Sequence, residues 1–324
     1  MKHQIVVGSL LALFSLLGLH FVSIEPVKAV DRGHVVLRAT GTALQWFEQN
    51  GWPNEDEVSY EVSIYVSNLF WGSSAYNHGY YGNDIAVSKS NILSLIEEFN
   101  SYDYATFFIY THGINYTMYD VVYISVIYRG WVPAAYYPVQ HYQFWDSYDQ
   151  AVNDYEIWPK TNSSVIYFIF IWSCAQGKEI GSYHASYWIS QSIYYAGTGA
   201  AGMPCAWTHR NYTQMSSDGY ANPDNGPYCF IGFEGWSKPL SEQITGTNKN
   251  YGDFVKNFYQ NLLQNGRSIN QALDQASRAI WGYMGVQDFD DTVFYNGYWD
   301  SVPGRGLWFG KMHVYGNGGN TLPH

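Results

Sequence analysis

Two strongly apolar runs in this chain each end on a reactive side chain. The run 105–111 is followed by His112 and Gly113, and the run 165–173 is followed by Cys174. Short runs rich in β-branched and aromatic residues are typical of buried strands. Because ligands bind at the carboxyl ends of the strands in open α/β sheets, the sequence predicts that the imidazole and the thiol reach the same edge of one sheet.

The other expected elements alternate between strands and helices. Residues 58–68 have strand periodicity, and a helix over 91–99, capped by Ser88 or Ser90, leads into the first apolar run. Further along we expect a hairpin and loop inserted over 119–159, then the second apolar strand and a helix over about 182–195. Strands over 199–207 and 228–234 are expected next, followed by helices over 253–263 and 269–280 and a final strand over 307–315. A Ser268–Gln271 capping box opens the second of these two helices. This order predicts a three-layer α/β/α sandwich with a mostly parallel sheet and a core over 58–315.

The N-terminus resembles an export signal. Lys2 precedes a mostly apolar stretch from Ile5 to Val22, and small residues near Ala29 suit a signal peptidase. We expect a signal peptide over 1–29 and a single domain over 30–324. The apolar stretch approaches the length that spans a bilayer, so an uncleaved membrane anchor is the alternative. The protein is therefore expected to be secreted or at the cell surface, with membrane contact only if the N-terminal segment is retained.

Charge and composition narrow the choice of partners. The formal net charge is -11, and 13% of the residues are charged whereas 19% are aromatic. Since the sequence has no basic patch, nucleic acids and anionic membrane surfaces are not expected as partners. The sequons at Asn115, Asn162 and Asn211 suit a glycosylated extracellular surface.

The three cysteines are Cys174, Cys205 and Cys229. Outside the cytosol, two cysteines that flank a polar loop are expected to pair, and the odd one is a candidate reactive thiol. Cys205 and Cys229 flank a segment rich in Gly, Asn and Asp, so we expect a disulfide between them and a free Cys174. The alternative for Cys174 is a small buried hydrophobic residue at a strand end. No Cys-x-x-Cys or His-x-x-x-His pair occurs in the sequence, and no metal site is predicted from such spacing.

These residues resemble the caspase-like clan of cysteine peptidases, which includes caspases, metacaspases, legumain, clostripain and gingipains. The separation of the two motifs, 174 − 112 = 62 residues, is close to the roughly 50 residues typical of caspases. Gly177 follows the cysteine by three positions, as in legumain and metacaspases. The paired helices over 253–280 are similar to the C-terminal helices of gingipain-like domains. The resemblance covers about 58–315, and only the two motifs are specific.

The resemblance implies a secreted endopeptidase that acts on peptide or protein substrates. Cys174 would be the nucleophile that forms a thioester acyl-enzyme, and His112 the general base and acid. The backbone N–H groups of Gly113 and Cys174 would form the oxyanion hole. Gly177 would allow a tight turn into a following helix, whose dipole favours a thiolate. Ordinary turn chemistry is the alternative for both glycines.

The chain also departs from the family pattern. Trp172 stands where clostripain and metacaspases have an Asp that helps to recognise basic residues, and the Arg residues by which caspases recognise Asp have no match, so the substrate preference is open. Glu234, Asp218 and Asp224 are candidates to line a pocket for a basic side chain, with solvated loop carboxylates as the alternative. A calcium ion is a further candidate ligand of the loop that holds Asp218, Asn222, Asp224 and Asn225, for which turn formation is the simpler explanation.

Two other functions compete with peptide hydrolysis. The first is a catalytically inactive binding protein on the same fold, because a fold does not guarantee activity. The second is an aromatic-rich surface protein that binds carbohydrate, which is suggested by 13 Trp and 31 Tyr residues. Selective alkylation of Cys174 would favour the enzyme over the inactive protein.

Overall fold

A mostly parallel sheet forms the centre of the fold, and the two apolar runs are neighbouring strands in it. The computed structural model describes residues 30–162, 164, 166–177, 181–210, 227–244, 246–281, 298–302 and 306–324. Strand β3 (Tyr104–Thr111) pairs in parallel with β7 (Ile166–Trp172), in a register that ends with Tyr110 opposite Trp172. The prediction that both runs are strands of one sheet is confirmed.

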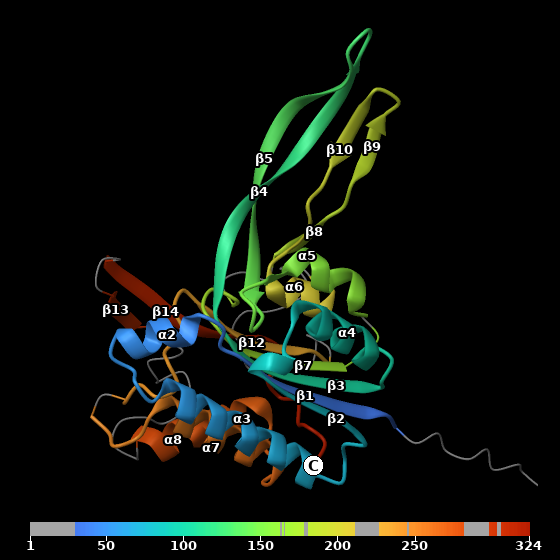
Figure 1. Ribbon diagram of the computed structural model, residues 1–324. Helices are drawn as coiled ribbons and strands as arrows, with labels where there is room; N and C mark the ends of the chain where they lie inside the picture. The colour runs from blue at the N-terminus through green and yellow to red at the C-terminus, as the bar shows by residue number, and fades with distance from the viewer. Residues whose placement is uncertain are drawn as a thin grey trace, which may run out of the picture. The chain divides into compact units, whose positions relative to one another are not determined.

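In the part of the chain that the structure describes, the sheet has seven strands in the order β13-β14-β12-β7-β3-β1-β2 (Figure 1). The five strands from β12 to β2 run parallel, whereas β14 is antiparallel to β12 and β13 to β14. The expected mixed α/β class with a mostly parallel sheet is therefore confirmed. The strands not yet defined are β1 (Arg32–Ala39), β2 (His78–Asn83), β12 (Cys229–Glu234), β13 (Tyr298–Val302) and β14 (Gly306–Gly316).

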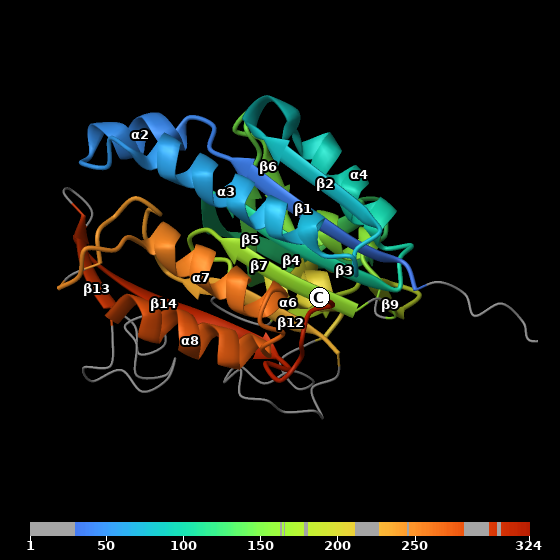
Figure 2. The same ribbon diagram turned by 90° about the horizontal axis from the view of Figure 1, so that it is seen from below.

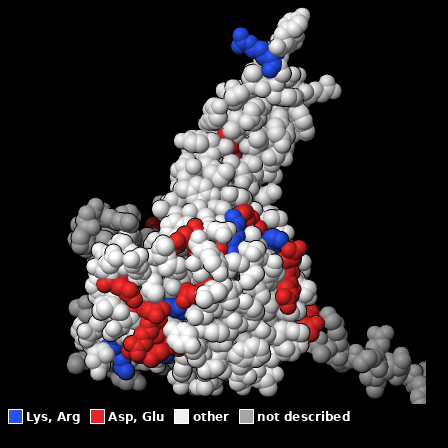
Figure 3. Space-filling view, viewed as in Figure 1, with Lys and Arg blue, Asp and Glu red and all other residues white. Residues whose placement is uncertain are grey.

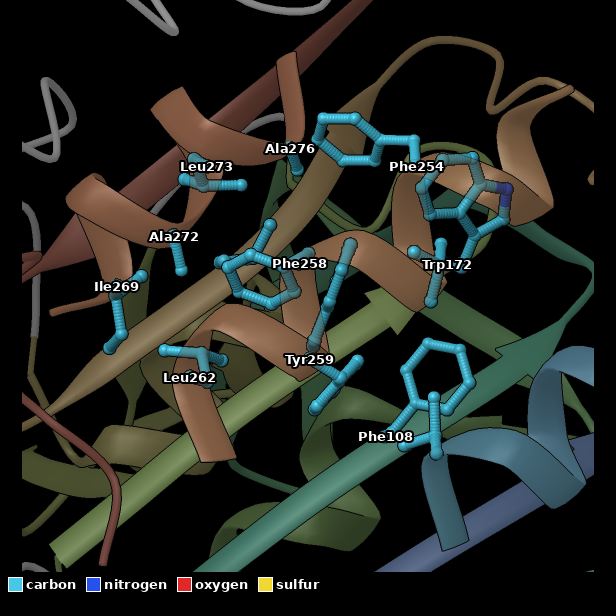
Figure 4. Packing of buried hydrophobic residues seen from close by; sticks show 14 of the residues in the cluster. Phe108, Trp172, Phe254, Phe258, Tyr259, Leu262, Ile269, Ala272, Leu273 and Ala276 are labelled. Carbon is cyan, nitrogen blue, oxygen red and sulfur yellow. The ribbon is translucent and has the colours of Figure 1, made fainter. Parts of the chain in front are cut away.

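Helices lie on both faces of this sheet (Figures 1 and 2). Each face has its own apolar core. One face is covered by α3 (Glu55–Gly72), α7 (Tyr251–Leu263) and α8 (Ile269–Trp281), and the other by α4 (Lys89–Phe99), α5 (Asp154–Ile157) and α6 (Met203–Thr208). In the first core, Phe108 packs against Tyr259 and Trp172 against Phe254, both of α7 (Figure 4). The short elements are α2 (Ala43–Gln49), η1 (Asp84–Ala86) and η2 (Trp158–Lys160).

Three helices follow the sequence pattern closely, and the N-terminal caps of two of them are the expected ones. The Ser88 hydroxyl accepts a hydrogen bond from the Asn91 N–H at 3.3 Å at the start of α4. At the start of α8, the Gln271 N–H donates to Ser268 Oγ at 3.3 Å and the Ser268 N–H donates to Gln271 Oε1 at 3.2 Å. The predictions of α4, α7 and α8 are confirmed to within a few residues.

The prediction of a strand over 58–68 is wrong, because these residues belong to α3. The apolar residues at alternate positions from Val58 to Val66 imitate a strand, but the buried side chains follow a helical period. The buried residues of α3 are Glu55, Ser59, Val62, Ser63, Val66, Ser67 and Phe70. Three acidic residues in the first turn, 55–57, also favour a helix, since they face the positive end of its dipole.

The prediction of a helix over 182–195 is also wrong. The segment contains the strands β8 (Ser182–His184), β9 (Tyr187–Ser190) and β10 (Ile193–Ala196). Its Tyr, Trp and Ile side chains favour strands wherever a partner edge is available, and β4 supplies that edge to β10. The strand expected over 199–207 is right only for β11 (Gly199–Ala201), because α6 follows with Pro204 in its first turn.

A second, antiparallel sheet lies in the chain between β3 and β7 and is extended by β9 and β10. Its strand order is β6-β5-β4-β10-β9, with β4 (Gly113–Val126), β5 (Gly130–Trp145) and β6 (Ala151–Asn153). The expected hairpin is present, although its first strand begins at Gly113 rather than near Tyr119. We call β4, β5, β9 and β10 the arm. Figure 1 shows the arm extending away from the main sheet, and Figure 3 shows few charged residues along it.

Asp31–His324 form one compact unit of the fold. Residues 1–29, on which the signal-peptide prediction falls, lie outside the described residues. Among the residues that the structure does describe, no helix is both long enough and apolar enough to cross a membrane.

His34 in β1 makes the folded state sensitive to acid. Its side chain is fully buried and its ring stacks on Phe70, with 4.8 Å between the ring centroids. Burial lowers the pKa of His34 from 6.5 to about 4, against a smaller opposing effect of the His78 backbone. Because the pKa is lower in the folded than in the unfolded state, the stability is fully present above about pH 6.5 and is lost as the pH falls through the folded-state pKa.

The free energy of unfolding of the wild type should fall between pH 7 and pH 4. We predict that His34→Phe, which keeps an aromatic ring in the core, makes this fall about 3 kcal/mol smaller. Urea unfolding of the wild type and the variant at both pH values measures this difference. The prediction fails if the two proteins lose the same amount of stability over this range.

Candidate active site

The paired ends of β3 and β7 bring His112 and Cys174 to the same level of the sheet. Tyr110 lies opposite Trp172 in the last parallel pair, and His112 and Cys174 each follow two residues later. Neighbouring strands are about 4.8 Å apart. The two residues therefore leave the carboxyl edge of the sheet at adjacent positions, and both side chains are partly exposed.

Gly113 packs directly against the peptide that carries Cys174. A Cβ atom at Gly113 would lie 2.4 Å from Ser173 Oγ and 2.7 Å from the carbonyl oxygen of Cys174. Because these distances are too short for real contacts, only glycine fits between the two strand ends. This close approach joins the His112–Gly113 motif to the Ser173–Cys174 motif.

The turn after β7 holds Cys174 in a constrained backbone. Ala175 has a φ of 64°, in the left-handed region, which costs a residue with a side chain roughly 1–2 kcal/mol. Its N–H donates to the carbonyl oxygen of Gly235 at 2.6 Å. The Gln176 amide donates to the carbonyl oxygens of Gln143 and Cys174, both at 2.8 Å. These contacts fix the turn against the loop after β12 and against β5.

Gly177 serves close packing against β12. A Cβ atom there would lie 2.4 Å from the carbonyl carbon of Gly232, and the Gly177 N–H donates to the Phe233 carbonyl oxygen at 2.9 Å. The helix expected to start near Ser182 is replaced by β8. The expected stabilisation of the Cys174 thiolate by the dipole of that helix is therefore wrong.

The Cys174 sulfur lies near a polar side chain. It is 3.6 Å from the Ser237 hydroxyl, in the loop after β12. The nearby Tyr110 is buried, and its hydroxyl donates to the Glu55 carboxylate. Burial above all, then the charge of Glu55, and to a smaller degree Cys174, raise the pKa of Tyr110 well above its ordinary value. Tyr110 thus remains a neutral hydrogen-bond donor beneath the site.

His112 forms one wall of an aromatic pocket. Its ring lies against the Trp145 ring, with 4.9 Å between the centroids, and its carbonyl oxygen accepts the Trp145 N–H at 3.0 Å. The pocket has a volume of about 240 Å³ and is lined by Thr42, Ala43, Trp46, His112, Trp145 and Trp236.

The prediction of a disulfide between Cys205 and Cys229 is wrong. Both are free thiols in the structure, and so is Cys174. Cys229 points into the core covered by α3, α7 and α8, whereas α6, which carries Cys205, packs on the opposite face of the sheet. Burial raises the pKa of Cys205 to about 12 and that of Cys229 further. Both are inert core thiols, and Cys174 is the partly exposed one.

The structure describes only one of the three carboxylates that were expected to line a substrate pocket. Glu234 Oε2 lies 3.0 Å from His313 Nε2 across the β12–β14 pair, and Glu234 does not line the pocket beside His112. Asp218 and Asp224 lie outside the described residues, together with the proposed calcium ligands and the sequon at Asn211. Of the other sequons, Asn162 is exposed and Asn115 is half-buried in β4.

No protein-family model matches this chain, and a comparison with curated proteins finds no match. The residues that the structure describes contain no group of three or more His, Cys, Asp or Glu side chains able to hold a metal ion.

Several residues at this edge have no role in the sequence-based interpretation. Gln176 lies inside the cysteine motif, but only the structure shows that its amide fixes the turn. Ser237 and the three tryptophans come from distant segments that the fold brings together. The high Trp content is the one sequence feature that points to an aromatic pocket, and it does not indicate which of the 13 tryptophans would line that pocket.

The contact between Gly113 and Cys174 predicts the effect of an added methyl group. We expect Gly113→Ala to destabilise the protein by about 1–3 kcal/mol, because the Cys174 peptide must move. Gly72→Ala is the matched control, since no atom lies within 4 Å of its Cβ position at the end of α3. Urea unfolding should find the control unchanged or slightly stabilised. Equal stability of the two variants would contradict the close approach.

Proposed function

We propose that this protein is a cysteine endopeptidase that hydrolyses peptide bonds through Cys174 and His112. The observation that carries the proposal is the contact of Gly113 with the Ser173–Cys174 peptide at the ends of the paired strands. This contact holds together the two strand ends that are followed by the partly exposed Cys174 and His112, and His112 lines a pocket. These are the elements that nucleophilic catalysis by cysteine requires.

In the first half of the reaction, His112 accepts the proton of the Cys174 thiol. The thiolate attacks the substrate carbonyl carbon, and the N–H groups of Gly113 and Cys174 stabilise the negative charge on the oxygen. When the C–N bond breaks, His112 donates its proton to the leaving amine. The new N-terminus departs, and the acyl group remains on Cys174 as a thioester.

In the second half, a water molecule replaces the amine. His112 accepts a proton from this water as it attacks the thioester carbonyl, and the proton then returns to the sulfur as the C–S bond breaks. The carboxylic acid product leaves and the thiol is restored. Gln176, which donates to the Cys174 carbonyl oxygen, is a positioning residue that keeps the turn in place through both halves.

The proposal extends to the fold family and the location. Helices on both faces of a mostly parallel sheet support a caspase-like three-layer α/β/α sandwich, to which the arm is an addition. The basic and apolar N-terminal sequence supports export to the cell surface or the medium.

Removal of either member of the dyad should abolish hydrolysis. We predict that Cys174→Ala and His112→Ala each lower kcat/KM for a cleaved peptide by at least about 1000-fold, and that the double variant is little worse, because the pair acts as a unit. Cleavage of a peptide mixture, followed by mass spectrometry, measures this loss.

Cys205→Ala is the matched control, since it removes a thiol that is buried away from the site. It should retain activity, and the circular dichroism of all four variants should match that of the wild type. Substantial cleavage by Cys174→Ala would refute the assignment of the nucleophile. Absence of cleavage by a folded wild type, with Cys174 no more reactive than a free thiol, would favour the inactive binding protein.

The arm supports carbohydrate binding as a second candidate function. Its sheet exposes many large aromatic side chains, whose faces are suited to stacking on sugar rings. More than two fifths of the residue surface is exposed at Tyr119, Trp131, Tyr136, Tyr137, Tyr187 and Trp188. Trp131 and Trp188 lie side by side, with 5.2 Å between their ring centroids.

We predict that this binding, unlike hydrolysis, is independent of Cys174. Cys174→Ala should bind the same polysaccharides as the wild type on a glycan array, whereas Trp131→Ser with Trp188→Ser should lose at least about tenfold in affinity. The exposed Trp71, in α3, provides the control variant Trp71→Ser. An array without any bound glycan would reject this second function.

A further inference from the structure

The pocket beside His112 is formed by three tryptophans from separate parts of the chain. Trp46 lies in α2, which follows β1, Trp236 follows β12, and Trp145 is the last residue of β5. The rings of Trp46 and Trp236 approach each other, with 5.8 Å between their centroids. Since β1 and β12 run parallel to β3 and β7, all these segments meet at the carboxyl edge of the sheet.

The same loop that supplies Trp236 also touches Cys174. The next residue, Ser237, places its hydroxyl 3.6 Å from the sulfur, and the preceding residue, Gly235, accepts the Ala175 N–H at 2.6 Å. His112 is itself part of the pocket wall. A side chain bound in this pocket therefore belongs to a residue close to the bond that Cys174 attacks.

Among the residues that the structure describes, the wall of this pocket contains no carboxylate that would recognise a basic side chain. Apart from His112, its lining consists of Thr, Ala and Trp residues. The neighbouring carboxylates already have hydrogen-bond partners: Asp149 accepts from the N–H and hydroxyl of Thr42 behind the pocket wall, at 3.1 and 3.0 Å, and Glu234 bonds to His313 at 3.0 Å. A Lys or Arg side chain would meet no carboxylate in the described wall of the pocket itself, so burial of its charge there would be costly.

The size of the pocket suits an aromatic ring. Its volume of about 240 Å³ exceeds the roughly 150 Å³ of an apolar cavity that holds a benzene molecule. Indole walls also offer edge-to-face and offset contacts that favour an aromatic guest over a small aliphatic one. We infer that this pocket selects substrates with an apolar, preferably aromatic side chain within two residues of the scissile bond. The inference rests on the proposed peptidase function and names its substrate class.

The test is cleavage-site profiling of the full-length protein with a peptide library of mixed sequence. Aromatic and large aliphatic residues should be enriched at one position within two residues of the cleaved bond. At that position, kcat/KM for a Phe peptide should exceed that for the matched Lys peptide by at least about tenfold. Ala43→Asp, which places a carboxylate in the pocket wall at the favourable first turn of α2, should reduce this ratio by at least about tenfold.

Gln45→Asp is the matched control, because it adds the same charge to an exposed position of α2 that does not line the pocket. Its Phe-to-Lys ratio should stay within about twofold of that of the wild type. Two results would overturn the inference and leave the peptidase function standing. The first is Cys174-dependent cleavage without apolar enrichment at any of these positions. The second is an equal change of the Phe-to-Lys ratio in the Ala43→Asp and Gln45→Asp variants. No cleavage by the folded wild type would refute the peptidase function, and the inference with it.

Discussion

The in-register parallel pairing of β3 with β7 is the constraint on which the rest of the site depends. Both strands are buried on both faces, so alternation of polar and apolar residues cannot set their register. Large side chains such as Phe108 and Trp172, packed against α7, and the close contact of Gly113 with Ser173 set it instead. A slip by one residue would turn these side chains to the wrong face and separate the two motifs.

The arm and the loop after β12 complete the edge that this pairing begins. β5, a strand of the arm, runs back toward the main sheet and ends at Trp145, whose backbone and ring both contact His112. The loop after β12 holds Ala175 in its left-handed conformation through Gly235. Backbone strain of this kind persists only where the surroundings overdetermine it. The turn that carries Cys174 is thus held by elements from both sheets.

The sequence predicts the parts of this fold whose signals are local, and fails where distant partners decide. The two apolar strands and the capped helices α4 and α8 follow from residues within the elements themselves. β1 cannot be recognised in the sequence, because the buried polar residues His34 and Arg38 interrupt its apolar pattern. The charge of Arg38 is paired with Asp56 and Asp84, which come from other elements. Likewise, the site motifs are visible in the sequence, whereas the tryptophans that line the pocket converge only through the topology.

The most direct test of the central claim is the rate of alkylation of the three cysteines by iodoacetamide, followed residue by residue with mass spectrometry. If His112 lies beside Cys174 and activates it, Cys174 should react at pH 6 faster than free cysteine, whose thiolate is scarce there. His112→Ala should slow this reaction by at least about tenfold, and the buried Cys205 and Cys229 should react only after unfolding. A Cys174 that reacts like free cysteine, with a rate that is independent of His112, would contradict the account.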